Sequence, residues 1–224
     1  MKAWRSSGRL AMSNQDGRNG DPRRALLSDN QSNGGVELGL VRALNERCLE
    51  LMVQLARSDL TPVPTAVAEN RNLWCGLDAI ARKRAASHRA LLLDISFADP
   101  TWWRCAADPK YIERRGAPPV HLPTKIASEL MRETVMLAWI IVRADQGLAT
   151  MLCGMAPPVA RLFASFGTPD IERIATRHSR HLRLRFDDHP SFWRTHLRLS
   201  GSSPFSSALD TEIQHPENRQ HPLF

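Results

Sequence analysis

Apolar and polar residues alternate at helical spacing over most of the chain. Pro62 and Pro64 break the first apolar stretch, and Thr65 is expected to cap a second helix that carries apolar residues as far as Ala81. The apolar positions of the first stretch lie three and four residues apart, which predicts a helix with one apolar seam. Such a short seam is more often part of the core than a dimer zipper. These positions are Val41, Leu44, Cys48, Leu51 and Leu55. Basic residues follow Ala81, toward the exposed end of the second helix, where cations also suit the macrodipole: Arg82, Lys83, Arg84 and Arg89.

A longer amphipathic helix is predicted to start at Thr124 and to end near Ala144. Its apolar residues recur three, four or seven positions apart and form one broad face: Leu130, Met131, Val135, Leu137, Ile141 and Val142. Gly154 is placed to stop the short apolar segment that follows. Pro157 and Pro158 open the next element at first-turn positions.

A glycine turn then joins two short helices. Gly167 ends one helix, and Thr168 is expected to be the N-cap of the next, with Pro169 at the first helical position and Asp170 in the positive first turn. This predicts a helix-turn-helix-like pair. The period then changes from 3.6 to 2, which predicts a short strand with one buried face, formed by Leu182, Leu184 and Phe186 alternating with outward Arg183 and Arg185.

These patterns predict an all-α, mainly helical fold with disordered termini. Residues 1–35 are polar, lack apolar periodicity and read as a disordered arm. Residues 36–108 form a helical domain of unknown role, and the proline-rich segment 109–123 reads as a linker. Residues 124–198 form a second helical domain, and 199–224 a disordered tail. The segment from Leu91 to Phe97 is ambiguous between a buried strand and a helix end.

The charge is strongly positive and is carried by arginine. The net charge is +7, and only four of the 30 basic residues are lysines. Arginine presents a planar fork that suits phosphate, so contact with DNA is one interpretation, and a high-GC genome with solvated arginines is the other. The predicted DNA-binding residues are Arg173, Arg177, Arg180, Arg183 and Arg185.

Enzyme and membrane functions find no support in the sequence. The apolar runs are too short to span a bilayer and the first residues show no signal-peptide pattern, so a cytoplasmic protein without a membrane partner is expected. The four cysteines lack paired spacing, and no cluster has the spacing of a common metal site. No nucleophile elbow or phosphate-binding glycine loop occurs. We therefore expect no catalytic residue, no metal, no cofactor and no small-molecule substrate.

Two adjacent tryptophans, Trp102 and Trp103, follow the turn at residues 98–101. Large aromatic side chains act either as core or as exposed anchors for a partner. Core is the better explanation of the pair, and both residues are kept as candidate partner-binding positions.

The region from about 124 to 198 resembles the FlhD family, the helical subunit of the flagellar master transcriptional regulator. The likeness is carried by LAWII with Asp145 a few residues on, by MLCGM, by the helix start at Phe166 to Pro169, by Ala175, and by RFDDH at Arg185 to His189. Asp145 is the position retained among those associated with family activity. The chain departs at three others: Leu152 replaces an arginine used in activation, His178 replaces an asparagine implicated in DNA action, and Leu182 replaces the cysteine that links two subunits.

The resemblance implies a helical homodimer, an FlhC-like partner subunit, promoter binding and recruitment of RNA polymerase. The first hypothesis is therefore a DNA-associated activator of flagellar or related secretion genes, a subunit of an oligomeric complex. The alternative is a non-enzymatic protein–protein adaptor of a flagellar or type III secretion system that retains the FlhD-like fold. Leu152 and His178 favour the adaptor, and the arginine-rich composition favours the regulator.

Overall fold

The computed structural model describes the backbone of residues 22–59, 62–110 and 122–202 and the side chains from Gly35 onward. The chain divides into two compact units, Met1–Gly35 and Val36–Phe224. Of the first unit, only the helical backbone from Pro22 is described, and it lies within the segment 1–35 for which no helix is expected.

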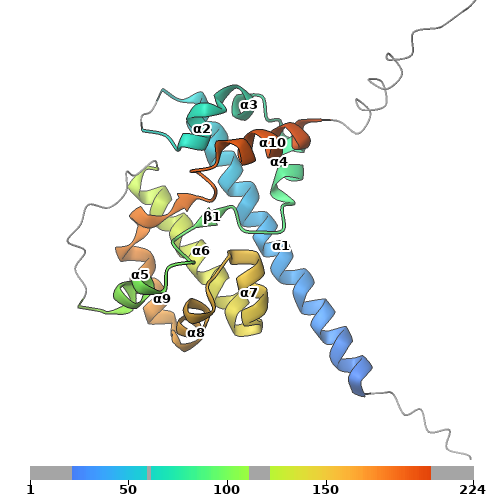
Figure 1. Ribbon diagram of the computed structural model, residues 1–224, viewed down its shortest axis with the longest axis vertical. Coiled ribbons are helices and arrows are strands. Elements are labelled where there is room, and N and C mark those ends of the chain that lie inside the picture. Colours follow the sequence, from blue (N-terminus) through green and yellow to red (C-terminus); the bar gives the residue numbers. More distant parts are fainter. Residues whose placement is uncertain (1–21, 60–61, 111–121, 203–224) are drawn as a thin grey trace, which may run out of the picture. The chain divides into compact units, whose positions relative to one another are not determined.

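The described residues are mostly helical, as the apolar periodicity predicts (Figure 1). The helices are α1 (Pro22–Arg57), α2 (Thr65–Glu69), α3 (Arg71–Cys75), α4 (Ala79–Ala86), α5 (Pro100–Ala107), α6 (Thr124–Ala144), α7 (Gln146–Cys153), α8 (Pro157–Ser165), α9 (Thr168–Arg177), the 3-10 turn η1 (Ser179–His181) and α10 (Pro190–Gly201). Two short strands, β1 (Leu93–Asp94) and β2 (Arg183–Leu184), complete the described elements.

Helix α6 is the centre of the unit and has the bounds that its apolar pattern predicts. Every residue expected on its apolar face is buried: Leu130, Met131, Val135, Leu137, Ile141 and Val142. Helices α7, α8 and α9 pack against α6 (Figure 1). The predicted stop at Gly154 is confirmed, since Gly154 ends α7 in the left-handed conformation with φ of 63°.

The predicted second helix, from Thr65 to Ala81, is wrong, because the structure divides this stretch into α2, α3 and the start of α4. Asn70 lies between α2 and α3, and its side-chain amide donates to the carbonyl oxygen of Ala66 at 3.0 Å and to that of Pro190 at 3.1 Å. Gly76 ends α3, and the Asp78 carboxylate caps α4 by accepting from the Ala81 N–H at 2.7 Å. Polar side chains that bond to the backbone therefore interrupt the helix where the apolar pattern continues.

The expected N-cap of α9 is wrong by one residue. The helix begins at Thr168 and its N-cap is Gly167. The Asp170 carboxylate accepts the Gly167 N–H at 3.0 Å, and this backbone bond is the main reason that the pKa of Asp170 lies below its ordinary value, with Arg173 lowering it further and burial opposing both. A carboxylate three residues into the helix thus binds the N-cap backbone.

The segment from Leu91 to Phe97 contains a strand. β1 pairs antiparallel with β2, with Leu93 opposite Leu184 and Asp94 opposite Arg183. The predicted alternation in the second strand stops at Leu184, because Phe186 has φ of 59° and leaves the extended conformation. The sheet joins one segment that precedes residue 108 to one that follows residue 124.

The segments 36–108 and 124–198, treated above as separate domains, share one hydrophobic core. Buried residues of α1 and of the stretch around β1 belong to the same cluster as those of α6 to α10. Helix α10 packs on α2, α3 and α4 and continues to Gly201, past the expected boundary at 198 (Figure 1). No helix among the described residues combines the length and the apolar content that a membrane crossing requires.

Candidate functional site

The arginines predicted on α9 bond to the chain itself. The guanidinium of Arg173 donates to the Asp170 carboxylate at 2.9 Å and to the Ala107 carbonyl oxygen at 3.0 Å. Arg177 donates to the Pro109 carbonyl oxygen at 2.6 Å. Both side chains therefore fasten α9 to the segment that leaves α5. Arg180, the third predicted residue, lies in η1 and is exposed.

The two arginines predicted on the second strand also have partners within the chain. Arg183 donates two hydrogen bonds, of 2.8 and 2.6 Å, to one carboxylate oxygen of Asp94 across the sheet. Arg185 is half-buried, and its Nη1 donates to the carbonyl oxygens of Leu91 at 3.1 Å and Leu152 at 3.3 Å. The outward orientation expected for Arg185 is therefore wrong. Four of the five predicted arginines thus donate to acceptors of this chain: Arg173, Arg177, Arg183 and Arg185.

Two segments that carry the FlhD resemblance meet in the structure. Arg185 begins RFDDH, and Gly154 lies in MLCGM. A Cβ on Gly154 would stand 1.6 Å from Nη2 of Arg185, so the guanidinium occupies the space that glycine leaves open. Asp145 has a local role: its carboxylate caps α7 by accepting the N–H groups of Gly147 at 2.6 Å and Leu148 at 3.1 Å.

The tandem tryptophans divide between core and edge. Trp103 is fully buried, its Nε1 donates to the Ser96 carbonyl oxygen at 3.1 Å, and it packs on Phe163. Trp102 is half-buried against His178 and His181, with ring centroids 5.5 and 4.8 Å away. The core interpretation therefore describes Trp103, and Trp102 packs beside it rather than projecting as an anchor.

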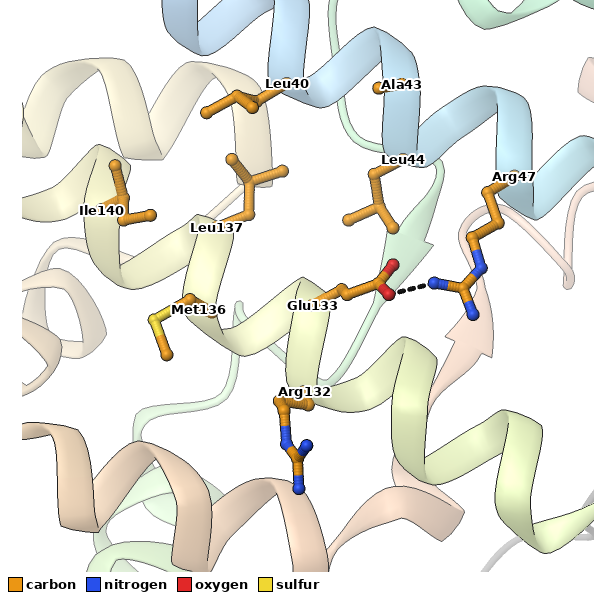
Figure 2. A pocket seen from close by; sticks show the side chains of 9 residues that line it. All are labelled: Leu40, Ala43, Leu44, Arg47, Arg132, Glu133, Met136, Leu137 and Ile140. Atoms are coloured by element: carbon orange, nitrogen blue, oxygen red, sulfur yellow. Dashed lines mark hydrogen bonds and ion pairs between the residues drawn. The ribbon is translucent and has the colours of Figure 1, made fainter.

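An apolar groove of about 490 Å³ lies between α1 and α6. Its floor is made by Leu44 and Leu137, and Leu40 and Ile140 stand at its edges with 43% and 41% of their surface exposed. Figure 2 shows these side chains converging from the two helices. The full lining is Leu40, Ala43, Leu44, Arg47, Arg132, Glu133, Met136, Leu137 and Ile140. A large apolar concavity on a folded surface is typical of an interaction site.

Charged residues border this α1–α6 groove. Arg47 of α1 forms an ion pair with Glu133 of α6 (Figure 2). It forms a second one, at 3.4 Å, with Glu129 on the same helix. On the other side of α6, Arg132 pairs with Glu172 of α9 at 2.9 Å. These pairs are partly exposed, so they contribute little to stability but set the charge pattern around the apolar centre.

The groove was not predicted from the sequence. The predicted seam of α1 begins at Val41, and it leaves out the neighbouring apolar residues Val36, Leu40 and Ala43, which are also spaced by four and three. On α6, Met136 and Ile140 extend the apolar surface beyond the buried face. One row of apolar residues is enough for a helix that buries one face. The second apolar row on α1 was therefore the sequence feature that could have indicated a further apolar surface.

Acid–base and metal chemistry have few candidates among the described residues. Burial raises the pKa of the Cys48 and Cys153 thiols to about 12, which keeps both protonated at neutral pH. Within residues 35–59, 62–110 and 122–202, no three histidine, cysteine, aspartate or glutamate side chains gather as a metal site would require. The groove is therefore the feature of the described unit that points most clearly to a function.

Comparison with known proteins yields no matching family model and no significant match among curated proteins or solved structures. The FlhD resemblance thus stays a prediction carried by the residues named above. The function is inferred from the geometry of the α1–α6 groove and from the charges around it.

Proposed function

We propose that this chain is a non-enzymatic protein-interaction module that associates with a second copy of itself through the α1–α6 groove. The observation that carries the proposal is the groove itself, with Leu40 and Ile140 partly exposed on either side of an apolar floor. Covering these side chains removes apolar surface from water, which stabilises an assembly by about 25 cal/mol per Å².

The charge pattern of α6 supports a second copy as the occupant. Glu129, Met136 and Arg143 are spaced by seven residues, so they lie along one exposed side of the helix. A two-fold axis at the level of Met136 would place α6 antiparallel to its counterpart. Glu129 of one copy would then face Arg143 of the other, twice in the dimer. Opposite charges at equal distances from an apolar centre make the surface self-complementary, as a two-fold interface requires.

The same packing places groove against groove. Because α1 lies beside α6 in each copy, the surface formed by α1 and α6 of one copy would face the same surface of the second copy. The apolar side chains form the centre of this interface, and the charged residues form its rim, the usual arrangement of a protein interface. The small side chain of Ala43 in the groove lining allows the two α1 helices to approach closely.

The test is the mass of the full chain in solution, measured by sedimentation velocity over a range of protein concentrations. Ile140→Asp places a carboxylate in the interface twice, and we expect it to weaken association by more than about 100-fold, or ~3 kcal/mol. Met151→Asp is the matched control, because Met151 is 72% exposed on α7 and lies outside the groove. Equal masses for the wild type and both variants at every concentration would refute the proposal.

A second proposal keeps the family resemblance: the dimer is the FlhD-like subunit of a DNA-associated activator of flagellar or related secretion genes, acting with an FlhC-like subunit. The contact between Gly154 and Arg185 favours it, because it gives the two resembling segments a joint structural role. A mobility shift on flagellar promoter DNA, with and without an FlhC-type protein, tests this proposal. A dimer that shifts no promoter fragment under either condition would leave the adaptor function.

A further inference from the structure

Helices α4 and α10 pack side by side and contain no carboxylate (Figure 1). The contact is close: Nε2 of His196 on α10 lies 3.1 Å from the carbonyl oxygen of Ala85 on α4. Asp78 directly precedes α4 and is committed to its N-cap. Asp187 and Asp188 lie shortly before α10, and Asp187 accepts the Ala66 N–H at 2.8 Å. No acidic residue of α4 or α10 therefore balances the positive charges on these two helices.

Six cations belong to this α4–α10 pair. Arg194 and Arg198 stand one turn apart on α10, and the others lie on α4 or just after it: Arg82, Lys83, Arg84 and Arg89. None of the six forms an ion pair with a carboxylate among the described residues. In contrast, α1, α6 and α9 contain acids as well as cations, and Arg47, Arg132 and Arg173 on these helices pair with carboxylates. The α4–α10 pair thus places six cations on two adjacent helices that supply no acid of their own.

Packing holds several of these side chains in place. Arg82 and Arg84 are half-buried, and the Nε of each is shielded from solvent without a hydrogen-bond partner. Arg84 also donates to the Ser202 carbonyl oxygen at 2.6 Å. A side chain whose stem is already fixed loses less conformational entropy when its head binds an anion, and partial burial strengthens the attraction.

We propose that the α4–α10 pair binds the phosphodiester backbone of duplex DNA. Five of the six cations are arginines, whose planar fork matches the oxygens of a phosphate, and a run of phosphates neutralises several of them at once. The α4–α10 surface does not include the arginines of α9, which donate to the carbonyl oxygens of Ala107 and Pro109. It also goes beyond the proposed self-association, because the α1–α6 groove uses other helices.

A lipid surface fits the α4–α10 pair less well. Helices that lie on membranes insert a continuous apolar face. Here the apolar faces of both helices, which include Ala81, Ala85, Trp193 and Leu197, are buried in the core. Only Ile80 and Leu199 remain as large exposed apolar side chains, at 67% and 71%.

The experiment compares two triple variants of the full chain that carry the same net charge. The test variant changes Lys83, Arg89 and Arg198 to Gln, three exposed residues of the α4–α10 pair. The control variant changes Arg42, Lys125 and Arg161 to Gln, three exposed residues on α1, α6 and α8. Each removes three charges from a net charge of +7. Binding to a short labelled duplex of mixed sequence is measured by fluorescence anisotropy over a series of NaCl concentrations, with sedimentation of each variant alongside.

We expect the test variant to bind more than about tenfold more weakly, and its log–log salt slope to be shallower by about 2 to 3, because each lost phosphate contact removes ~0.9. The control variant should keep the wild-type slope. Equal losses in both variants, or a wild-type protein that binds phosphatidylserine vesicles and no duplex, would overturn the assignment. Sedimentation separates this result from self-association. If the chain does not dimerise, sedimentation gives the mass of a monomer, and the difference in DNA affinity between the two triple variants should persist.

Discussion

Gly154→Ala tests the contact between the end of α7 and the segment after β2. Gly154 has φ of 63°, and a residue with a Cβ adopts this conformation at a cost of ~1–2 kcal/mol. The new Cβ would also lie 1.6 Å from Nη2 and 2.8 Å from Cζ of Arg185. The guanidinium must then move and give up its bonds to the carbonyl oxygens of Leu91 and Leu152, which costs a further ~1.5–3 kcal/mol.

The expected loss is thus about 2.5 to 5 kcal/mol in the free energy of unfolding, a large part of the ~5–15 kcal/mol typical of a domain. Thermal unfolding followed by circular dichroism should show a Tm lower by roughly 10 °C. Gly201→Ala is the control, because a Cβ there meets nothing within 4 Å, and its Tm should be nearly unchanged.

A double-mutant cycle separates the backbone cost of Gly154→Ala from the displacement of Arg185. In an Arg185→Ala background the guanidinium is absent, so Gly154→Ala should cost only the ~1–2 kcal/mol of the left-handed conformation. Chemical denaturation of the four proteins gives the coupling. If Gly154→Ala costs the same in both backgrounds, Arg185 does not depend on the space left by glycine, and the reasoning is wrong.

Three further predictions concern buried polar groups and thiols. Asn45 is fully buried, bonds to three carbonyl oxygens and accepts the Leu92 N–H at 2.8 Å, so Asn45→Ala should lower the free energy of unfolding in urea by about 3 kcal/mol, and a loss under ~1 kcal/mol would contradict this role. Burial, and secondarily a neighbouring histidine, lower the pKa of His196 below 6.5; the unfolded chain therefore binds a proton first as pH falls below 6.5, and the resulting acid-side loss of stability should be smaller in His196→Gln. With pKa values of about 12, Cys48 and Cys153 should resist a thiol reagent in the native protein and react once urea unfolds it; fast native labelling of both would argue against their burial.

A feature of the fold can be predicted from the sequence where a single element determines it, and not where it depends on a residue far along the chain. The bounds of α6 are predictable because its buried face repeats over the whole helix and because Asp145 begins a new one. The break of the second predicted helix depends on Asn70, whose amide bonds both to its own helix and to Pro190, far along the chain. Apolar periodicity carries no information about that second partner.

The same limit applies to the candidate site. Arginine composition indicates that anions are suitable partners, but whether an arginine is available depends on which carboxylate or carbonyl the fold brings to it. Arg183 meets Asp94 because β1 and β2 pair. Arg185 follows the end of β2, and its guanidinium bonds to the carbonyl oxygens of Leu91 and Leu152. The groove likewise arises from the way α1 and α6 lie beside each other, although the second apolar row of α1 is visible in the sequence.

The most direct measurement of the central claim is a charge-reversal series on the exposed side of α6, followed by sedimentation equilibrium. Arg143→Glu alone and Glu129→Arg alone each place like charges opposite one another in the proposed two-fold dimer, and Glu129→Arg also removes the ion pair with Arg47 of the same chain. Both single variants should therefore have a higher Kd, by about tenfold or more. The double variant restores opposite charges and should return toward the wild-type Kd. Single variants that associate as tightly as the wild type, or a double variant no better than either single one, would contradict self-association across the α1–α6 groove.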